Sequence, residues 1–471
     1  MFKKLFQPVD MTQGTPWKGL VLFAIPMLIG NIAQQLYSTV DSIIVGHFIG
    51  DNALAAVGSA LPLLNLMLVL FIGISAGATI MVSQYFGARA KEELASTIGT
   101  CVTMTAIVSL VVMVCAPPLM KPFLQLLNTP ADIIDDCKMY LIISMIGIAG
   151  MAFYNILSGI LRGMGDSTSA LVYLLIATGI NIVLDIFFVG VVRIGVAGVA
   201  IATAIAQGIS AALCMKKLMT LHHIFVLEKR HFKVNKKYMK RVIELGVPSG
   251  ATQAILSSAM IIVQSLTNCF GPMFIAANVI VMRVDGFAMM PNLTFGMAMT
   301  TYSGQNVGAG NLKRVDIGAK QGTILGIACS TTITAIILLF GKYLMMVFTD
   351  TAELVDLSVY IMRIMAIGYI AMAVTQCLSG IMRGAGDTLT PMWISLCTTV
   401  LFRVPLAYGI SFLTRSAELP FGRFECIAIS LVSAWVLGSV LTTIFYRRRK
   451  WKKKVLAQLE AKQESNKQNS L

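Results

Sequence analysis

Long apolar stretches alternate with short polar ones along almost the whole chain. A helix that spans the bilayer core needs about 20 apolar residues, because each residue adds about 1.5 Å. Twelve windows of the sequence meet this requirement. They run approximately over residues 18–46, 54–84, 93–117, 133–161, 168–191, 195–216, 241–269, 274–303, 316–341, 353–381, 388–412 and 426–446. The pattern predicts an all-α membrane protein with twelve transmembrane helices.

Composition places most of the chain in lipid. Of the 471 residues, 56% are hydrophobic and 13% are charged, against about 25% charged in an ordinary soluble domain. The mean hydropathy of +0.79 would leave large apolar patches on the surface of any water-soluble fold. A soluble globular enzyme is therefore excluded, and we expect a multi-pass protein of the cell membrane.

The net charge of +15 is arranged as a topology signal. Counted on alternate sides of the twelve windows, 28 of the 37 basic residues lie on one side and six on the other. The remaining three, Arg283, Arg363 and Arg403, fall inside predicted spans. By the positive-inside rule, both termini are expected to be cytoplasmic. Because the basic residues lie in short loops between spans, we expect no nucleic-acid partner.

An internal repeat divides the chain into two halves. The segment SGILRGMGDST (158–168) recurs as SGIMRGAGDTL (379–389), 221 residues later, and the same offset relates Gln84 to Gln305. Each half holds six helices, so the halves share one orientation and are related by an axis along the membrane normal. We expect an N-lobe over 1–216, a basic cytoplasmic linker over 217–240, a C-lobe over 241–447 and a basic cytoplasmic tail over 448–471.

The repeated RGxGD motif lies at a cytoplasmic hairpin between the fourth and fifth helix of each half. Its residues are Arg162, Gly163, Gly165, Asp166, Arg383, Gly384, Gly386 and Asp387. The glycines allow positive φ or close helix approach, and each Asp, which is followed by Ser or Thr, can cap the next helix. The alternative is a phosphate-binding glycine loop, but no GxxxxGK[ST] spacing occurs in the chain and we expect no ATPase.

Signals for other chemistry are weak. The nine cysteines include no CxxC pair, so we expect neither a disulfide framework nor a structural metal site. No HExxH motif or nucleophile–base pair is visible, and no selectivity-filter loop. The sequence therefore favours a transporter over a membrane enzyme or a channel.

Polar residues of the first half fall on one face of each of three predicted helices. They are Asn31, Gln34, Ser38 and Asp41 on the first, Thr178, Asn181 and Asp185 on the fifth, and Thr203, Gln207 and Ser210 on the sixth. At 1.5 Å per residue, Asp41, Asp185 and Thr203 lie at a similar depth, roughly 9–12 Å from the outer face. They can share one pocket, whose lining we expect to include Gln34, Tyr37, Ser38, Thr178 and Gln207.

Two carboxylates close together in a low dielectric cannot both be ionised cheaply. One of them should hold a proton, or both should hold a cation. The pair Asp41 and Asp185 therefore predicts a site for H⁺ or Na⁺. The alternative is a polar network that packs helices together and has no transport role. Pro26 and Gly30 predict a kink in the first helix, which is either static or a hinge.

The second half carries different intramembrane charges. At the repeat offset Asp185 falls on Leu406, and the eighth and eleventh helices instead carry Arg283, Asp285 and Arg403. Residues i and i+2 of one helix do not face each other, so we expect Asp285 to pair with Arg403, and Arg283 to turn toward backbone carbonyls or a cleft. The alternative is that Asp285 is a second titrating site and Arg403 only snorkels.

The repeated hairpins, together with PMLIGNIAQQLYSTVDSIIVGHFIG (26–50) and ISAGATIMVSQYFGA (74–88), resemble the multidrug and toxic compound extrusion (MATE) family. The resemblance implies two pseudo-symmetric six-helix lobes around a central cleft. In the DNA-damage-inducible F-type branch, which this chain is similar to, the coupling residues correspond to Asp41, Asn181, Asp185 and Thr203. The branch with carboxylates on the seventh and tenth helices is not matched, which argues against a sodium site of that type.

These observations together predict a secondary antiporter that exports amphiphilic, cationic organic compounds in exchange for H⁺ or Na⁺. Its expected partners are small organic substrates and the bilayer, with no cofactor besides the coupling ion, and we expect a monomer. The alternative is a flippase for lipid-linked oligosaccharides from a related superfamily. A flippase cavity should be basic to hold pyrophosphate, whereas the interior of the first half is acidic.

Overall fold

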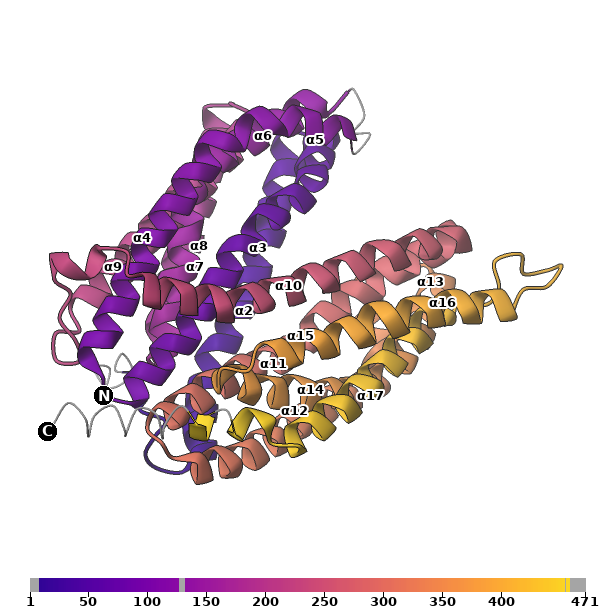
Figure 1. The fold of residues 1–471 in the computed structure, drawn as a ribbon. Coiled ribbons are helices and arrows are strands. Elements are labelled where there is room, and N and C mark those ends of the chain that lie inside the picture. The colour runs from indigo at the N-terminus through magenta and orange to yellow at the C-terminus, as the bar shows by residue number, and fades with distance from the viewer. Residues whose placement is uncertain (1–7, 127–131, 454, 458–471) are drawn as a thin grey trace, which may run out of the picture. The chain divides into compact units, whose positions relative to one another are not determined.

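The computed structural model describes residues 8–126, 132–453 and 455–457. These residues form helices joined by short loops and contain no strand (Figure 1). In the first half the helices are α2 (Pro16–Phe48), α3 (Asp51–Gly87), α4 (Lys91–Cys115), α5 (Met120–Leu126), α6 (Ile134–Ile146), α7 (Ile148–Gly163), α8 (Ser167–Asp185), η2 (Ile186–Val191) and α9 (Val196–Met219). In the second half they are α10 (Lys236–Thr267), α11 (Pro272–Gly308), α12 (Leu312–Met346), α13 (Ala352–Ala366), α14 (Gly368–Gly384), α15 (Leu389–Ser395), η5 (Leu396–Phe402), α16 (Arg403–Leu413) and α17 (Cys426–Arg447).

The predicted twelve spans are present in the described part of the chain. Ten helices are long and apolar enough to cross a membrane, and three of them include a short π-helical or 3₁₀-helical segment. Two bent helix pairs bring the number to twelve. The bent pairs are α6 with α7, at 52°, and α13 with α14, at 44°. The sequence windows 133–161 and 353–381 were expected as single helices, and each is instead two. At the first bend a Cβ on Gly147 would overlap the side chain of Ala204 in α9, so the glycine lets α9 approach.

The described residues form two compact units, which each combine most of one half with a short piece of the other. The first contains residues 8–10 and 25–250, and the second contains residues 11–24 and 251–457. The boundary within α2 falls next to Pro26, and the boundary within α10 falls two residues after Pro248. Both prolines remove one backbone hydrogen bond from their helix, so each unit ends where its helix is weakened.

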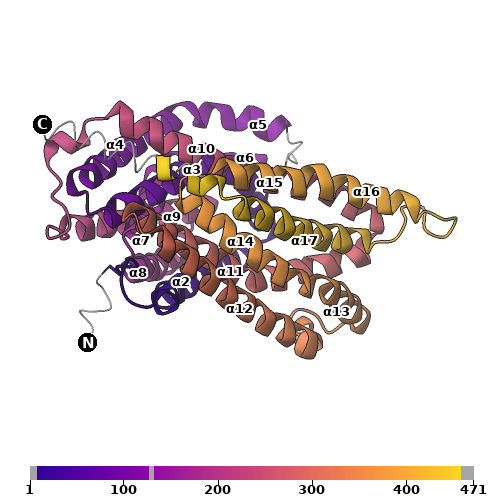
Figure 2. The same ribbon diagram turned by 60° about the horizontal axis from the view of Figure 1, so that its bottom comes forward.

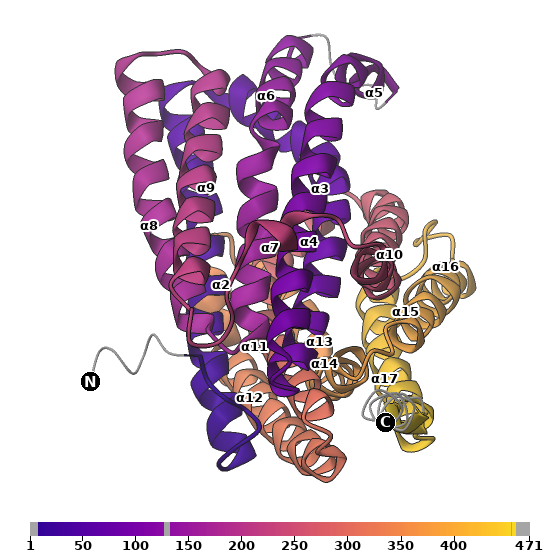
Figure 3. The same cartoon turned by 60° about the vertical axis from the view of Figure 1, so that its left-hand side comes forward.

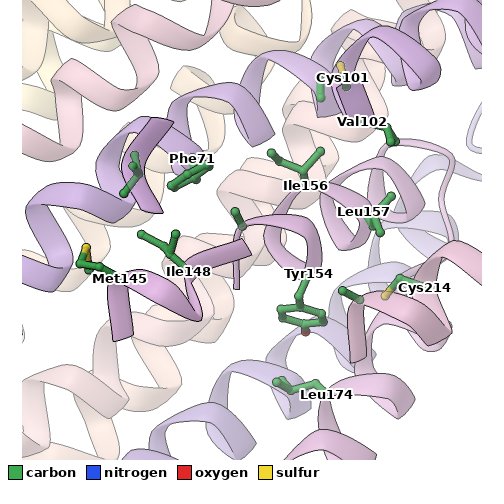
Figure 4. Close-up of a cluster of buried hydrophobic side chains, with 14 of the residues drawn as sticks. Phe71, Cys101, Val102, Met145, Ile148, Tyr154, Ile156, Leu157, Leu174 and Cys214 are labelled. Atoms are coloured by element: carbon green, nitrogen blue, oxygen red, sulfur yellow. The ribbon is translucent and has the colours of Figure 1, made fainter. Parts of the chain in front are cut away.

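In the first unit, α7 packs against α3, α4 and α9. Figure 3 shows α8, α9, α7 and α4 running side by side. The core between them is built from fully buried aliphatic and aromatic side chains, among them Phe71 of α3, Cys101 of α4 and Ile156 of α7 (Figure 4). This packing holds the helices that carry the polar residues of the first half.

In the second unit, α14 packs against α11, α12 and α17 (Figure 2). The contact between α11 and α14 is partly polar: Asn292 Nδ2 donates to the backbone oxygen of Tyr369 at 3.2 Å, and Asn292 Oδ1 accepts a hydrogen bond from the Ser330 hydroxyl. A buried amide that both donates and accepts a hydrogen bond in this way fixes the register of the helices that surround it.

The glycines of the repeated hairpins have the two roles that were predicted. Gly165 and Gly386 have φ values of +92° and +91°, a region that side chains with a Cβ rarely adopt. Gly163 and Gly384 lie against backbone carbonyls of α3 and α11, where a Cβ would collide. The same backbone geometry is therefore built twice.

The acidic residue of each hairpin caps the following helix. Asp166 Oδ1 accepts from the backbone N–H of Ser169 at 2.9 Å, and Asp387 Oδ1 accepts from that of Thr390 at 3.2 Å. Each carboxylate thereby satisfies an amide that the helix itself leaves unpaired. The capping role predicted for the Asp of RGxGD is therefore observed at both hairpins.

Candidate functional site

The polar face of α2 brings Asp41 toward α8. Asp41 is half-buried and Asp185, the last residue of α8, is fully buried. The two carboxyl groups are close enough to interact directly. Oδ1 of Asp41 and both carboxylate oxygens of Asp185 are enclosed without a donor from the described part of the chain. Two neighbouring acceptors without donors form a place where a proton or a cation lowers the free energy.

Thr203 of α9 connects this pair of helices to a third. Its Oγ1 accepts a hydrogen bond from Asn181 Nδ2 of α8 at 3.4 Å and lies 3.2 Å from the Tyr37 hydroxyl of α2. Asn181 Oδ1 is a further buried acceptor for which the described residues supply no donor. The structure thus brings Asp41, Asn181, Asp185 and Thr203 together from three helices.

Tyr140 of α6, which the sequence analysis did not single out, belongs to the same group. Its buried phenol interacts electrostatically with both Asp41 and Asp185. It also lines a cavity of about 40 Å³, enclosed by α3, α6, α7 and α9, whose polar wall is Tyr140, Ser144, Thr203 and Gln207. That volume admits about three water molecules. A lone tyrosine in an apolar run gives no spacing signal, so the sequence alone did not reveal it.

The residues expected to line the pocket have different positions. Gln207 lies on the wall of this cavity and Tyr37 bonds to Thr203. The hydroxyl of Thr178 instead donates to the backbone oxygen of Leu174 in its own helix at 2.9 Å. Gln34 is exposed on α2, and the side chain of Ser38 lies outside the described part of the structure.

The first-helix residues Pro26 and Gly30 lie inside the continuous helix α2. A Cβ on Gly30 would be 3.5 Å from the side chain of Leu171, which is an ordinary contact. Packing therefore does not require glycine at this position, and a kink or hinge here stays a prediction.

The predicted ion pair of the second half is not a direct contact. Asp285 Oδ1 accepts a hydrogen bond from the Tyr369 hydroxyl of α14 at 2.8 Å. Arg403 interacts with Asp285 only electrostatically, without a salt bridge within 4.0 Å between these two described side chains. Arg403 Nε is buried without an acceptor, and Arg283 is exposed. The two residues were predicted to pair because they lie at a similar depth. In the structure the Asp285 carboxylate accepts its hydrogen bond from Tyr369 instead.

The charged groups of the hairpins serve the structure. Burial raises the pKa of the Asp166 carboxyl, while its hydrogen bonds from Ser169 and the ammonium of Lys217 at 3.7 Å oppose the shift. Arg162 and Arg383 are half-buried at the ends of α7 and α14. Asp166 thus caps α8, and Arg162 and Arg383 lie in the last turns of α7 and α14.

Comparisons with known proteins agree with this architecture. The sequence pattern of the MatE family matches residues 26–187 and again 248–409. The chain is 27% identical over 456 residues to the probable multidrug resistance protein YoeA of Bacillus subtilis strain 168, covering 94% of this chain and 96% of that protein. It is 25% identical over 451 residues to the probable multidrug resistance protein NorM of Thermotoga maritima, covering 93% and 94%.

Solved structures share the fold. A MOP superfamily transporter from Pyrococcus furiosus superposes with a TM-score of 0.86 at 22% identity, over 94% of this chain and 98% of that one. A MATE structure in the bent conformation superposes with a TM-score of 0.87 at 23% identity, over 95% and 99%. Since the family pattern covers most of the chain in two copies, one in each half, this protein belongs to the MatE family of membrane transporters.

Proposed function

We propose that this transporter is a secondary antiporter that exports amphiphilic organic cations, and that the ion driving it binds between Asp41 and Asp185. The observation that carries the proposal is the pair of neighbouring carboxyl groups with three enclosed oxygens that the described residues leave without donors. Relatives named as multidrug resistance proteins support the substrate class. An acidic interior also disfavours pyrophosphate, which argues against a lipid-linked oligosaccharide.

The oxygen atoms of and around the pair suit either H⁺ or Na⁺. A proton would turn one carboxyl into a donor for the other, and Na⁺ would take oxygens from Asp41, Asp185, Asn181 and Thr203. Occupation by either ion removes the repulsion within the pair. Release of the ion restores the repulsion. Binding of the ion can drive substrate export only if the ion-bound and ion-free proteins differ in conformation. The small cavity beside Tyr140 is lined by Thr203, which bonds to Asn181, so it places polar groups next to the residues around the pair.

Proteoliposomes with an imposed gradient test the proposal. Ethidium uptake is followed by its fluorescence on encapsulated DNA, once with an acidic lumen and once with a sodium-loaded lumen. We expect one of these gradients to drive uptake by the unchanged protein. Asp41→Asn and Asp185→Asn should each reduce that uptake below about one tenth, because the amide keeps the shape but cannot exchange a proton or balance a cation.

The matched control is Asp135→Asn, which neutralises an exposed carboxylate in the first turn of α6. It should leave uptake unchanged. Uptake by both pair variants at the wild-type rate, at equal protein per vesicle, would show that Asp41 and Asp185 only pack helices together.

A further inference from the structure

The end of α17 carries a dense group of basic residues. Six of the seven residues over 447–453 are Arg or Lys. Among them only Lys452 forms an ion pair with a described carboxylate, since its Nζ lies 2.6 Å from Asp316 Oδ2. The other five are exposed, and they are Arg447, Arg448, Arg449, Lys450 and Lys453. Like charges on neighbouring residues repel one another, so an anionic partner would stabilise this group.

The segment that carries these charges is fixed within the second unit. Arg449 has a φ of +55°, which interrupts the regular helix. Trp451 is 2% exposed, and its ring stacks on that of Tyr446 with centroids 5.6 Å apart. Its Nε1 donates to the backbone oxygen of Tyr446 at 3.3 Å. Together with the ion pair from Lys452 to α12, these contacts keep the exposed cations beside the end of α17.

The start of α12 extends the basic surface. Lys313 and Lys320 lie three residues before and four residues after Asp316, so they share a helix face with it. Both lysines are exposed. Asp316 is the only acidic residue of α12, and α17 contains none. Because Lys452 neutralises Asp316, the positive charges of both helix ends remain unbalanced by these helices.

α17 connects this surface to an apolar face. Its 22 residues extend about 33 Å, which matches the hydrocarbon core of a bilayer, about 30 Å. The exposed side chains of Val436, Val440 and Ile444 follow one another at a spacing of four residues, and Arg448 is the next position on the same face. One exposed face of the helix thus offers apolar contacts along its length and positive charge at its end.

We propose that this surface binds an anionic phospholipid, with the headgroup at the basic residues of 447–453 and α12 and the acyl chains along the exposed face of α17. A soluble anion would use only the charges, and a phospholipid without net charge would use mainly the apolar face. An anionic phospholipid uses both. The proposal concerns an interaction surface and does not depend on the export function.

Native mass spectrometry of the full chain, purified in detergent and freed of lipid, tests the proposal. Phosphatidylglycerol and phosphatidylcholine are added in equal amounts, and the bound lipids are counted. We expect phosphatidylglycerol to be favoured by at least about fivefold, the contribution of one basic residue at an anionic surface. Glycerol phosphate, which carries the anion without acyl chains, should neither bind nor displace the lipid.

Two variants change the charge of the surface in opposite directions. The first combines four exposed substitutions: Arg448→Gln, Arg449→Gln, Lys450→Gln and Lys453→Gln. It should reduce the preference for phosphatidylglycerol to less than about twofold. Asp316→Asn removes the one carboxylate of the surface and frees Lys452, so it should raise the preference. A gain of binding cannot result from misfolding.

The matched control removes the same number of charges from exposed positions of the loop between α9 and α10, by combining Lys229→Gln, Lys233→Gln, Lys236→Gln and Lys237→Gln. It should keep the preference. Equal binding of the two lipids to the unchanged protein overturns the proposal, as does an equal loss in the control. Displacement of the lipid by glycerol phosphate, or an Asp316→Asn variant whose preference fails to rise, does the same.

Discussion

Tyr369→Phe removes one hydroxyl from the interior of the second unit and changes little else. The ring packs against Trp435, with centroids 5.6 Å apart, and the backbone oxygen accepts from Asn292. Both contacts remain in phenylalanine. What is lost is the 2.8 Å hydrogen bond to Asp285 Oδ1 and a weak 3.8 Å contact with the sulfur of Met362.

The expected cost follows from that single bond. A hydrogen bond to a charged group contributes about 1.5–3 kcal/mol in soluble proteins, and side-chain bonds between membrane helices average about 0.6 and reach about 1.7 kcal/mol. Because Tyr369 is fully buried and the bond is short, we expect a loss of about 1–2 kcal/mol in the free energy of unfolding. Titration of the purified protein with sodium dodecyl sulfate measures it.

A double-mutant cycle identifies the cause. In an Asp285→Leu background the hydroxyl has no carboxylate to bind, so Tyr369→Phe should then cost almost nothing. The matched control is Tyr360→Phe, which removes a 3.3 Å bond from an exposed tyrosine to Glu425 and should cost less than about 0.5 kcal/mol. An equal loss from Tyr369→Phe in both backgrounds would refute the assignment of the bond.

Three other predictions concern the scaffold. Gly384→Ala forces a Cβ into the backbone of α11 and should lower the free energy of unfolding by about 1–3 kcal/mol. The control Gly179→Ala, with nothing within 4 Å of its Cβ, should not lower it. Equal losses from the two variants would contradict the close approach of Gly384 to α11. Asp166→Ala should cost about 1 kcal/mol and Asp166→Asn much less in the same titration, because an asparagine oxygen still caps α8. A cysteine at exposed Lys233, in a cysteine-free background, should resist an impermeant maleimide in intact cells and react after lysis, and labelling in intact cells would reverse the predicted topology.

Most of the fold could be predicted because lipid imposes a simple requirement on each span. The window 426–446 corresponds to α17 at Cys426–Arg447, and the window 195–216 corresponds to α9 at Val196–Met219. Apolar length alone defines such segments. It does not reveal the bends between α6 and α7 or between α13 and α14, because both helices of each pair remain apolar across the break.

Part of the candidate site could be predicted from depth. Asp41, Asp185 and Thr203 lie at similar heights in the predicted helices, and the structure brings them together, although their role in coupling stays a prediction. Depth gives no information on which neighbouring helix a side chain faces. For that reason Asp285 was assigned to Arg403 although it accepts its hydrogen bond from Tyr369. Tyr140 was missed because a single tyrosine in an apolar run gives no spacing signal.

The two halves of the chain have kept one backbone design and acquired different intramembrane charges. The hairpin glycines have nearly the same positive φ, and both acidic caps persist. The fifth span of each half also contains a π-helical segment, which follows Asp185 directly in the first half and precedes Arg403 directly in the second. A π-helical turn is costly and often marks a functional position.

These segments connect the scaffold to its charges. A π-helical turn inserts an extra residue and rotates the side chains beyond it, so it can aim a charged group at a neighbouring helix that a regular helix would miss. The first half uses this device beside a carboxylate, and the second uses it beside a guanidinium. At the repeat offset Asp185 corresponds to Leu406 and Arg403 corresponds to Ile182, so neither charge has a counterpart in the other half. Because the second half has a leucine where the first half has Asp185, we expect the driving ion to bind in the first lobe and not at the equivalent place in the second.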